Sequence, residues 1–353
     1  MGAAAFIMAE TLGIKYKEIV VAAAIPALIY YLGIIFQIQL RASKDKLDGM
    51  PKDQLPKVKE TLKMYWHLTI PILFLVYMLF FSGYTVIKGA FLTILLTIVI
   101  AQLKKETRMS LKDIEDAFVA SAKSTVSVAI ACACVGIVIG VSSLTGFTIN
   151  MASAIISLGG KSLLLTLVFT MVTCMLLGMG LPSIPAYIIT VTIAAPALIE
   201  LGIVPLAAHL FCFYFAMFAN ITPPVALASF AAAGISGGNP MKTGIVSIKL
   251  ALAGFIIPYM FVYNNQLLLM DTNILQGIQV TITACVGVFL ISAAVEGYFH
   301  TKANILMRLL MLAGAFLLID SALLTDLAGV GIFVASIFIQ RILARREARR
   351  AAA

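Results

Sequence analysis

Long apolar runs recur along the whole chain and limit its fold more than any other feature. A helix of about 20 apolar residues crosses the roughly 30 Å hydrocarbon core of a bilayer. Runs suited to this are residues 19–40, 65–84, 86–103, 123–143, 243–262, 275–295, 303–320 and 327–341. With 61% hydrophobic residues, 12% charged residues and a mean hydropathy of +1.05, the composition is not that of a soluble domain. The sequence predicts an all-α polytopic membrane protein.

Basic residues are concentrated in three segments. Residues 41–63 carry seven Lys or Arg, residues 104–112 four and residues 340–350 five, whereas residues 264–273 and 320–329 carry none. The positive-inside rule makes the first three segments cytoplasmic, including the C-terminus. The positive charge thus serves to orient the chain in the lipid bilayer, and we expect no nucleic-acid partner. Residues 104–122 suit either an amphipathic connector along the inner surface or a solvated helical loop.

The five cysteines lie in apolar runs without CxxC spacing, at Cys132, Cys134, Cys174, Cys212 and Cys285. This pattern argues against a disulfide framework and against a metal cluster. We interpret the cysteines as small core residues and expect no organic cofactor.

Glycine and proline interrupt two of the hydrophobic segments. The first interruption is "GMGLPSIP" at 178–185, between the short runs 161–178 and 184–200; the second is "NITPP" at 220–224. Ser183 is expected to cap a half-helix with Pro185 in its first turn, and Thr222 another with Pro223 at its first position. Non-helical backbone at membrane depth must be buried in protein or line a cavity. A proline kink that only adjusts packing is the alternative.

The flanking charges make helices 123–143 and 243–262 both run from the cytoplasmic side to the outer side. The chain between them must therefore cross the membrane an odd number of times. One interrupted crossing at 203–235 and a re-entrant hairpin at 161–200 meet this requirement, although two full spans in place of the hairpin would also do so. Freed carbonyls near Gly178, Gly180 and Asn220 would suit Na⁺, and half-helix N-termini would suit an anionic substrate. The candidate binding residues are Gly178, Gly180, Pro182, Ser183, Pro185 and Thr190 at the hairpin tip, and Asn220, Thr222, Pro223, Pro224 and Ser229 at the broken helix.

The sequences around both interruptions resemble one family. "LLGMGLPSIPAYIITVTIAAPAL", "FANITPPVALASFAAAGISGGNP" and "LLIDSALLTDLAG" are similar to the large membrane subunit of tripartite ATP-independent periplasmic (TRAP) transporters, of the fused type that works with TAXI-type solute receptors. The resemblance implies a permease of the bacterial inner membrane. It implies Na⁺ symport of small organic acids delivered by a periplasmic TAXI-type solute-binding protein. It also implies two inverted repeats, each with a re-entrant hairpin and a broken helix, and an elevator motion within a scaffold.

The N-terminal residues resemble the part of fused permeases that follows the first broken helix. Within the chain, "MGAAAFIMAETLG" aligns with "VALASFAAAGISG", which pairs Ala4 with Ala228, Phe6 with Phe230, Ala9 with Ala233 and Gly13 with Gly237. We therefore expect an N-terminally truncated, C-terminal part of a longer permease. Its partners would be the missing N-terminal permease part or a small membrane subunit.

The expected domains follow from these segments. They are the end of the first transport repeat (1–40), a basic cytoplasmic loop (41–64), scaffold helices with the amphipathic connector (65–122), the second transport repeat (123–262, with hairpin 161–200 and broken helix 203–235), and a C-terminal transmembrane extension with a basic tail (263–353).

Two other functions compete with the transporter. A half-permease could serve as an assembly or scaffold subunit that is inactive alone. The stretch 234–238 matches GxSxG around Ser236, which would suit an intramembrane serine hydrolase if a histidine reached it. His209 lies far along the segment and is interpreted as an interior residue or, less favoured, a proton relay. We expect no enzyme.

Overall fold

The computed structural model describes residues 2–47, 49–51, 55, 57–160, 162–270, 272–318 and 323–352, excluding the side chains of residues 127, 323 and 343–352. This part of the chain contains fifteen α-helices, two short 3-10 helices and no strand. Seven of its helices are long and apolar enough to cross a membrane. The expected all-α polytopic fold is confirmed.

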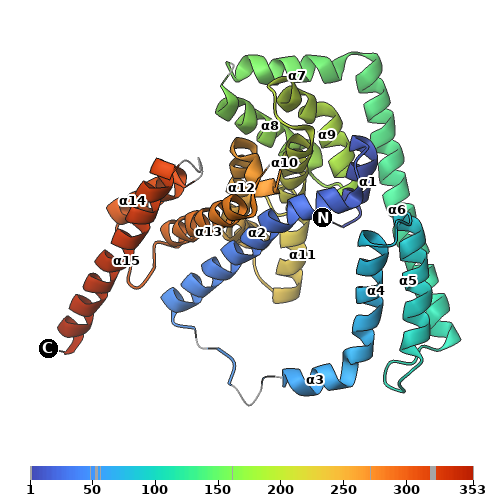
Figure 1. The fold of residues 1–353 in the computed structure, drawn as a ribbon, viewed down its shortest axis with the longest axis horizontal. Coiled ribbons are helices and arrows are strands. Elements are labelled where there is room, and N and C mark those ends of the chain that lie inside the picture. Colours follow the sequence, from blue (N-terminus) through green and yellow to red (C-terminus); the bar gives the residue numbers. More distant parts are fainter. Residues whose placement is uncertain are drawn as a thin grey trace. The chain divides into compact units, whose positions relative to one another are not determined.

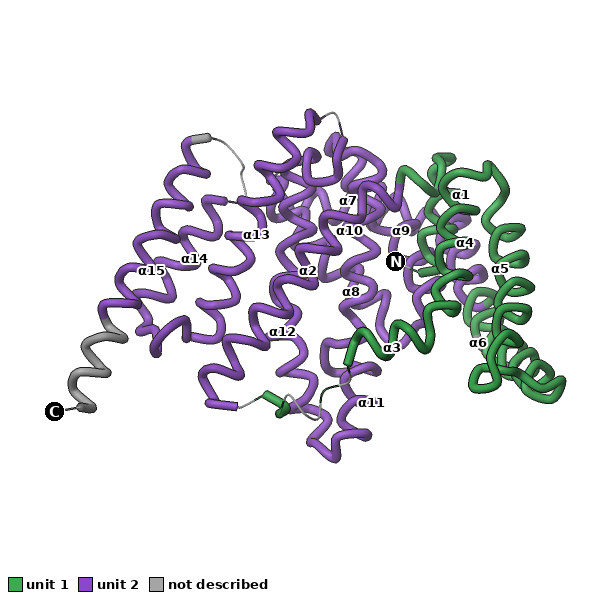
Figure 2. The backbone as a smooth tube through the Cα atoms, turned by 60° about the horizontal axis from the view of Figure 1, so that its bottom comes forward, with its two compact units in different colours: residues 1–18, 48–133 green, residues 19–47, 134–353 purple. Residues whose placement is uncertain are grey.

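The chain divides into two compact units (Figure 2). Unit 1 comprises residues 1–18 and 48–133, and unit 2 comprises residues 19–47 and 134–353.

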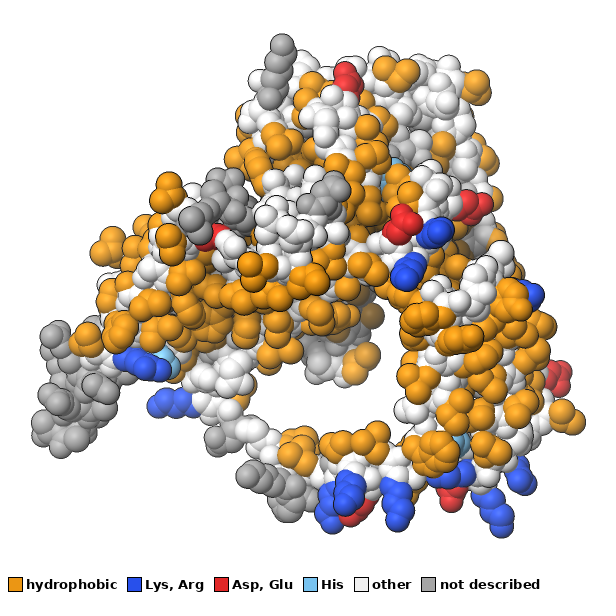
Figure 3. All heavy atoms as spheres, viewed as in Figure 1, with side chains coloured by type: hydrophobic (Ala, Val, Ile, Leu, Met, Phe, Trp, Pro, Cys, Tyr) orange, Lys and Arg blue, Asp and Glu red, His pale blue; other side chains and the backbone are white. Residues whose placement is uncertain are grey.

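Unit 1 contains α1 (Ala4–Leu12), α3 (Val58–Tyr65), α4 (Thr69–Phe80), α5 (Val86–Ala101) and the first part of α6 (Leu111–Leu144). Its Lys and Arg side chains gather along α3 and near the turn between α5 and α6 (Figure 3). A reciprocal cap starts α6, since Ser110 N donates to Asp113 Oδ2 at 2.7 Å and Asp113 N donates to Ser110 Oγ at 3.2 Å. The helix then continues to Leu144, so the expected connector 104–122 has no helix end near residue 122.

Unit 2 begins within α2 (Tyr16–Asp45) and continues through α12 (Pro240–Tyr263), α13 (Ile274–Glu296), α14 (Ile305–Leu317) and α15 (Leu323–Ala352). Cations surround the C-terminus of α13, where free carbonyls concentrate negative charge. Lys44 Nζ donates to the Glu296 carbonyl at 2.6 Å, and Arg308 Nε donates to the Ala294 carbonyl at 2.6 Å. Arg41 lies 3.5 Å from the Glu296 carboxylate, which is nearly buried. These contacts tie α2 and α14 to one end of α13.

Unit 2 also contains shorter helices. Helices α7 (Phe147–Leu158), α8 (Leu163–Gly178), α9 (Ser183–Glu200) and α10 (Pro205–Phe218) pack on one another, and α11 (Leu227–Ser236) packs on α12 (Figure 1). Of an 18-residue apolar stretch in α9, 61% is buried inside the protein, whereas the share for such a stretch in α6 is 6%. Helix α9 therefore lies inside the protein. Tyr187 of α9 and Phe211 and Phe215 of α10 are among the largest fully buried side chains.

Two helix ends share one local geometry, at the positions aligned in the sequence. Gly13 after α1 has φ +66°, and Gly237 after α11 has φ +70°. Ile14 N donates to the Ala9 carbonyl at 3.2 Å, as Gly238 N does to the Ala233 carbonyl at 3.1 Å. This bond with a left-handed residue defines a Schellman cap. The same cap ends α13, where Gly297 has φ +61° and Tyr298 N donates to the Ala293 carbonyl at 3.3 Å, so the internal repeat stays a prediction.

Helix α14 covers 305–317 of the expected run 303–320, and residues 319 and 320 of that run lie outside the described part of the chain. Its 13 residues give a length of about 20 Å, at 1.5 Å per residue. Glycines bring it close to α15: a Cβ added to Gly314 would lie 2.7 Å from Ile332 Cγ2, and one added to Gly329 would lie 2.9 Å from the Gly314 carbonyl oxygen. Small residues that allow close helix approach are typical of packing in lipid.

This contact predicts opposite outcomes for two neighbouring glycines of α15. Gly329→Ala should destabilise the protein by about 1–3 kcal/mol because its methyl group overlaps the backbone of α14. Gly331→Ala is the matched control, since a Cβ there meets no atom within 4 Å. Thermal unfolding of the purified proteins in detergent measures the difference, and equal melting temperatures would contradict the packing.

Candidate functional site

The first part of the site is the tip of the α8–α9 hairpin. Helix α8 ends at Gly178, and α9 begins at Ser183. The chain reverses through Gly180 at φ +74°, a left-handed conformation that favours glycine. With 16 residues, α8 is about 24 Å long, which is less than the hydrocarbon thickness.

The second part is the break between α10 and α11. Helix α10 ends at Phe218, and α11 begins at Leu227. The intervening segment contains a cis peptide between Pro223 and Pro224. Ala228 N donates back to the Asn220 carbonyl at 2.9 Å. The break is therefore an ordered loop of several residues and not a simple proline kink.

The two expected hydroxyl caps are wrong. Ser183 is the first residue of α9, and its N-cap position is occupied by Pro182, which has no side chain able to accept a hydrogen bond. Thr222 Oγ1 donates to the Phe218 carbonyl at 2.8 Å, so it closes the end of α10. Helix α11 starts later than expected, after Ala226 at φ +38°. Ser183 thus lies inside α9 and not at its N-cap, and Thr222 belongs to the end of α10 and not to the start of α11.

The tip and the break meet in space. A Cβ added to Gly180 would lie 3.8 Å from Val225 Cγ1, which is ordinary van der Waals distance. Below the tip, a Cβ added to Gly178 would lie 2.8 Å from the Ala216 carbonyl oxygen and 2.9 Å from Ala216 Cα. On the other side of the break, a Cβ on Gly244 of α12 would lie 2.8 Å from Pro223 Cγ. Segments about 40 residues apart thus form one site.

Several polar groups at this site have no partner in the described part of the chain. The side chains of Ser183 and Asn220 make no hydrogen bond there, and Ser183 is exposed. The N–H groups of Ser183 and Ile184, at the start of α9, donate to no carbonyl. The carbonyls of Pro223 and Pro224 accept no hydrogen bond from any described residue. The tip therefore offers donors, and the break offers acceptors.

Other candidates are engaged in local structure. Thr190 Oγ1 is fully buried and donates to the Ala186 carbonyl at 2.7 Å. Ser229 Oγ is nearly buried and donates to the Ile221 carbonyl at 3.2 Å, which stabilises the break. Pro185 is buried in the first turn of α9, whereas Pro182 is exposed at the tip. These residues shape the site more than they face it.

Neutral oxygen atoms are the ligands that this region offers to a cation. Among the described residues, no group of three His, Cys, Asp or Glu side chains could hold a metal ion. Na⁺ accepts carbonyl and hydroxyl oxygens as ligands in broken-helix transporters.

Sequence reasoning missed the hydrogen bond between Tyr187 and His209. The Tyr187 hydroxyl lies 2.9 Å from His209 Nδ1, between α9 and α10, and His209 is only 7% exposed. His209 is therefore a partnered interior residue, as the sequence favoured. The available signal was a histidine among the mostly apolar residues of α10.

Sequence reasoning also missed how closely α8 approaches α10. Small residues recur every four positions as Cys174 and Gly178 on α8 and as Cys212 and Ala216 on α10. Cys174 lies next to Cys212, one turn from the contact of Gly178 with Ala216. This spacing on both helices was the available signal.

The GxSxG match is a helix end. Ser236 is the last residue of α11, its Oγ lies 3.4 Å from the Ala233 carbonyl, and it accepts a hydrogen bond from Gly238 N at 3.3 Å. His209 bonds instead to Tyr187. Within the described chain, Ser236 thus has no histidine partner to activate it.

The α8–α10 contact predicts that Gly178 tolerates no side chain. Gly178→Ala should destabilise the protein by about 1–3 kcal/mol because the methyl group meets the backbone of Ala216. Gly234→Ala in α11 is the control, since its Cβ meets no atom within 4 Å. Thermal unfolding in detergent compares them, and a Gly178→Ala protein as stable as the control would refute the contact.

Comparison with known protein families matches residues 1–274 to the "Tripartite ATP-independent periplasmic transporter, DctM component" family. Comparisons with curated proteins and with solved structures found no significant match. The matched residues include both α8–α9 and the α10–α11 break, and they end at the start of α13. The chain belongs to the DctM family of TRAP transporter membrane components.

Proposed function

We propose that the chain is the permease component of a Na⁺-coupled TRAP transporter that imports small organic acids delivered by a periplasmic TAXI-type solute receptor. DctM components work with a periplasmic solute-binding protein and a small membrane subunit. The observation that carries the proposal is the contact between the hairpin tip, at Gly180, and the break, at Val225. Interrupted helices of this kind form the substrate and ion sites of many secondary transporters.

The acceptors at the break support Na⁺ as the coupling ion. Pro223 and Pro224 have carbonyls without hydrogen-bond donors, and the Asn220 side chain has no partner among the described residues. An unpaired carbonyl inside a membrane protein is costly, and a monovalent cation can satisfy it. Na⁺ needs no charged ligand for this, so an uncharged site can release it again.

The donors at the tip support a negatively charged substrate. The free N–H groups of Ser183 and Ile184 lie at the N-terminus of the 18-residue helix α9. A helix N-terminus carries about half a positive charge and binds carboxylate or phosphate groups. A small organic acid fits this donor set. The elevator motion implied by the resemblance would carry the hairpin together with α10, since Gly178 packs on Ala216 and Tyr187 bonds to His209.

Na⁺ binding should stabilise the protein. At a Na⁺ concentration about ten times Kd, the stabilisation is about 1.4 kcal/mol. We expect a higher melting temperature in NaCl than in KCl at equal ionic strength. Asn220→Ala and Gly180→Leu should abolish the difference, whereas Asn150→Ala, at an exposed position on α7, should retain it. Measurement uses the complete transporter purified in detergent; identical NaCl and KCl curves for the wild type would count against Na⁺ coupling.

Two substitutions of Ser183 separate the roles of its hydroxyl and its N–H group. Ser183→Ala removes only the hydroxyl. Ser183→Pro also removes the N–H, at a helix position where proline is tolerated and after Pro182, whose ψ of 160° is compatible with a following proline. We expect Ser183→Pro to lower kcat/KM for the organic acid about tenfold more than Ser183→Ala, because it removes a hydrogen bond to a charged group.

The assay is uptake into proteoliposomes that contain the complete transporter and its solute receptor. Equal kcat/KM for the two variants would show that the α9 N-terminus does not bind the substrate.

A further inference from the structure

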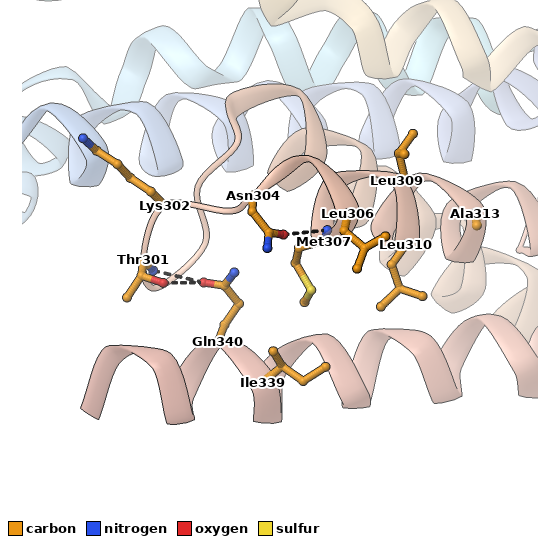
Figure 4. A pocket seen from close by; sticks show the side chains of 10 residues that line it. All are labelled: Thr301, Lys302, Asn304, Leu306, Met307, Leu309, Leu310, Ala313, Ile339 and Gln340. Carbon is orange, nitrogen blue, oxygen red and sulfur yellow. Dashed lines mark hydrogen bonds between the residues drawn. The ribbon is translucent and has the colours of Figure 1, made fainter. Parts of the chain in front are cut away.

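A cavity lies between α14 and α15, in the part of unit 2 that follows the family match (Figure 4). Its volume is about 690 Å³. One end is polar and is lined by Thr301, Lys302, Asn304 and Gln340. The remainder is an apolar groove lined by the side chains of Leu306, Met307, Leu309, Leu310, Ala313 and Ile339.

The polar end contains a buried amide with a free donor. Gln340 is 0% exposed, and its Oε1 accepts from Thr301 N at 3.1 Å and from Thr301 Oγ1 at 2.9 Å. These two bonds fix the orientation of the amide. Its Nε2 has no hydrogen-bond partner among the residues that the structure describes. Leaving such a donor unpaired costs about 1–3 kcal/mol, so a ligand oxygen at this point would be stabilising.

Asn304 provides a second amide at this end, whose oxygen is also engaged in a hydrogen bond. Asn304 is the N-cap of α14, and its Oδ1 accepts from Met307 N at 2.9 Å. The oxygen is therefore used and the Nδ2 donors are left over. In Figure 4 the amide groups of Asn304 and Gln340 both point into the space between the two helices. The polar end thus presents N–H donors to a ligand.

The surrounding charges are positive. Lys302 and Arg341 are exposed at this end, and Arg308 lies nearby, bonded to the Ala294 carbonyl. Glu296, the acidic side chain at the same end of α13, is already paired with Arg41 and Lys44. By the positive-inside rule, this end faces the cytoplasmic leaflet. The ligand must therefore be anionic, rich in acceptor oxygens and continued by an apolar chain.

We infer that the cavity binds an anionic phospholipid of the cytoplasmic leaflet, of the phosphatidylglycerol type. Its phosphate and ester oxygens would accept from Gln340 Nε2, Asn304 Nδ2 and Lys302, and one acyl chain would lie along Leu306, Leu310 and Ile339. Basic pockets between membrane helices on the cytoplasmic side bind anionic head groups in this way. The lipid would join α14 to α15 at the end opposite the Gly314–Gly329 contact.

The test compares lipid binding to the full chain, purified in detergent, by native mass spectrometry. Phosphatidylglycerol and phosphatidylcholine of identical acyl composition are the probes. We expect the wild type to bind phosphatidylglycerol at least tenfold more tightly. Asn304→Asp keeps the cap acceptor but replaces the donor with a negative charge, so it should lower phosphatidylglycerol affinity about tenfold. Lys302→Gln should lower it as well.

Matched controls separate the cavity from general charge effects. Asn239→Asp alters an equivalent N-cap, whose Oδ1 accepts from Lys242 N at 3.0 Å, and Lys112→Gln removes an exposed charge in unit 1. Both controls should bind the lipid as the wild type does. Equal affinity for the two lipids, or an equal loss in Asn304→Asp and Asn239→Asp, would overturn the inference. Ala313→Trp, which fills the apolar groove, should weaken both the affinity and the lipid-dependent rise in melting temperature.

Discussion

Lipid offers no hydrogen bonds to the peptide backbone, and this constraint shapes unit 2. A chain in a membrane can leave helical geometry only where protein or a ligand satisfies its freed N–H and carbonyl groups. The hairpin tip and the α10–α11 break are two such departures, and they lie against one another. Part of the requirement is met internally, by Ala228 N on the Asn220 carbonyl and by Ser229 Oγ on the Ile221 carbonyl. The groups left over are those to which we propose that Na⁺ and the organic acid bind.

Close packing by small residues holds this arrangement together. Helices gain little from hydrophobic burial in lipid, so stability comes from van der Waals contact and from hydrogen bonds between helices. Gly178 brings α8 onto the backbone of α10, and Gly329 brings α15 onto α14. Between α9 and α10, the bond from Tyr187 to His209 adds a polar link in a buried setting. The hairpin and the first half of the broken helix are therefore packed together as one body.

Much of this could be predicted from the sequence, because length and hydropathy determine which segments can cross a membrane. The positions of both interruptions followed from the restrictions that glycine and proline place on a helix. The roles of Ser183 and Thr222 were predicted wrongly, since a hydroxyl beside a proline can either start a helix or close the preceding one, and only the backbone path decides. The partners Ala216, Val225 and His209 are distant in sequence, and composition carries no record of such pairings.

A cysteine crosslink between the hairpin tip and the break tests the central claim most directly. Cysteines at Gly180 and Val225, in a chain whose five native cysteines are replaced, can be oxidised in native membranes. A protease site inserted at 201–203, between α9 and α10, makes the crosslink visible because the cut fragments stay joined. The pair Gly180 and Gly234 serves as the control. Rapid crosslinking of Gly180 with Val225 alone is the predicted result. Separation of the fragments for both pairs would contradict a shared site.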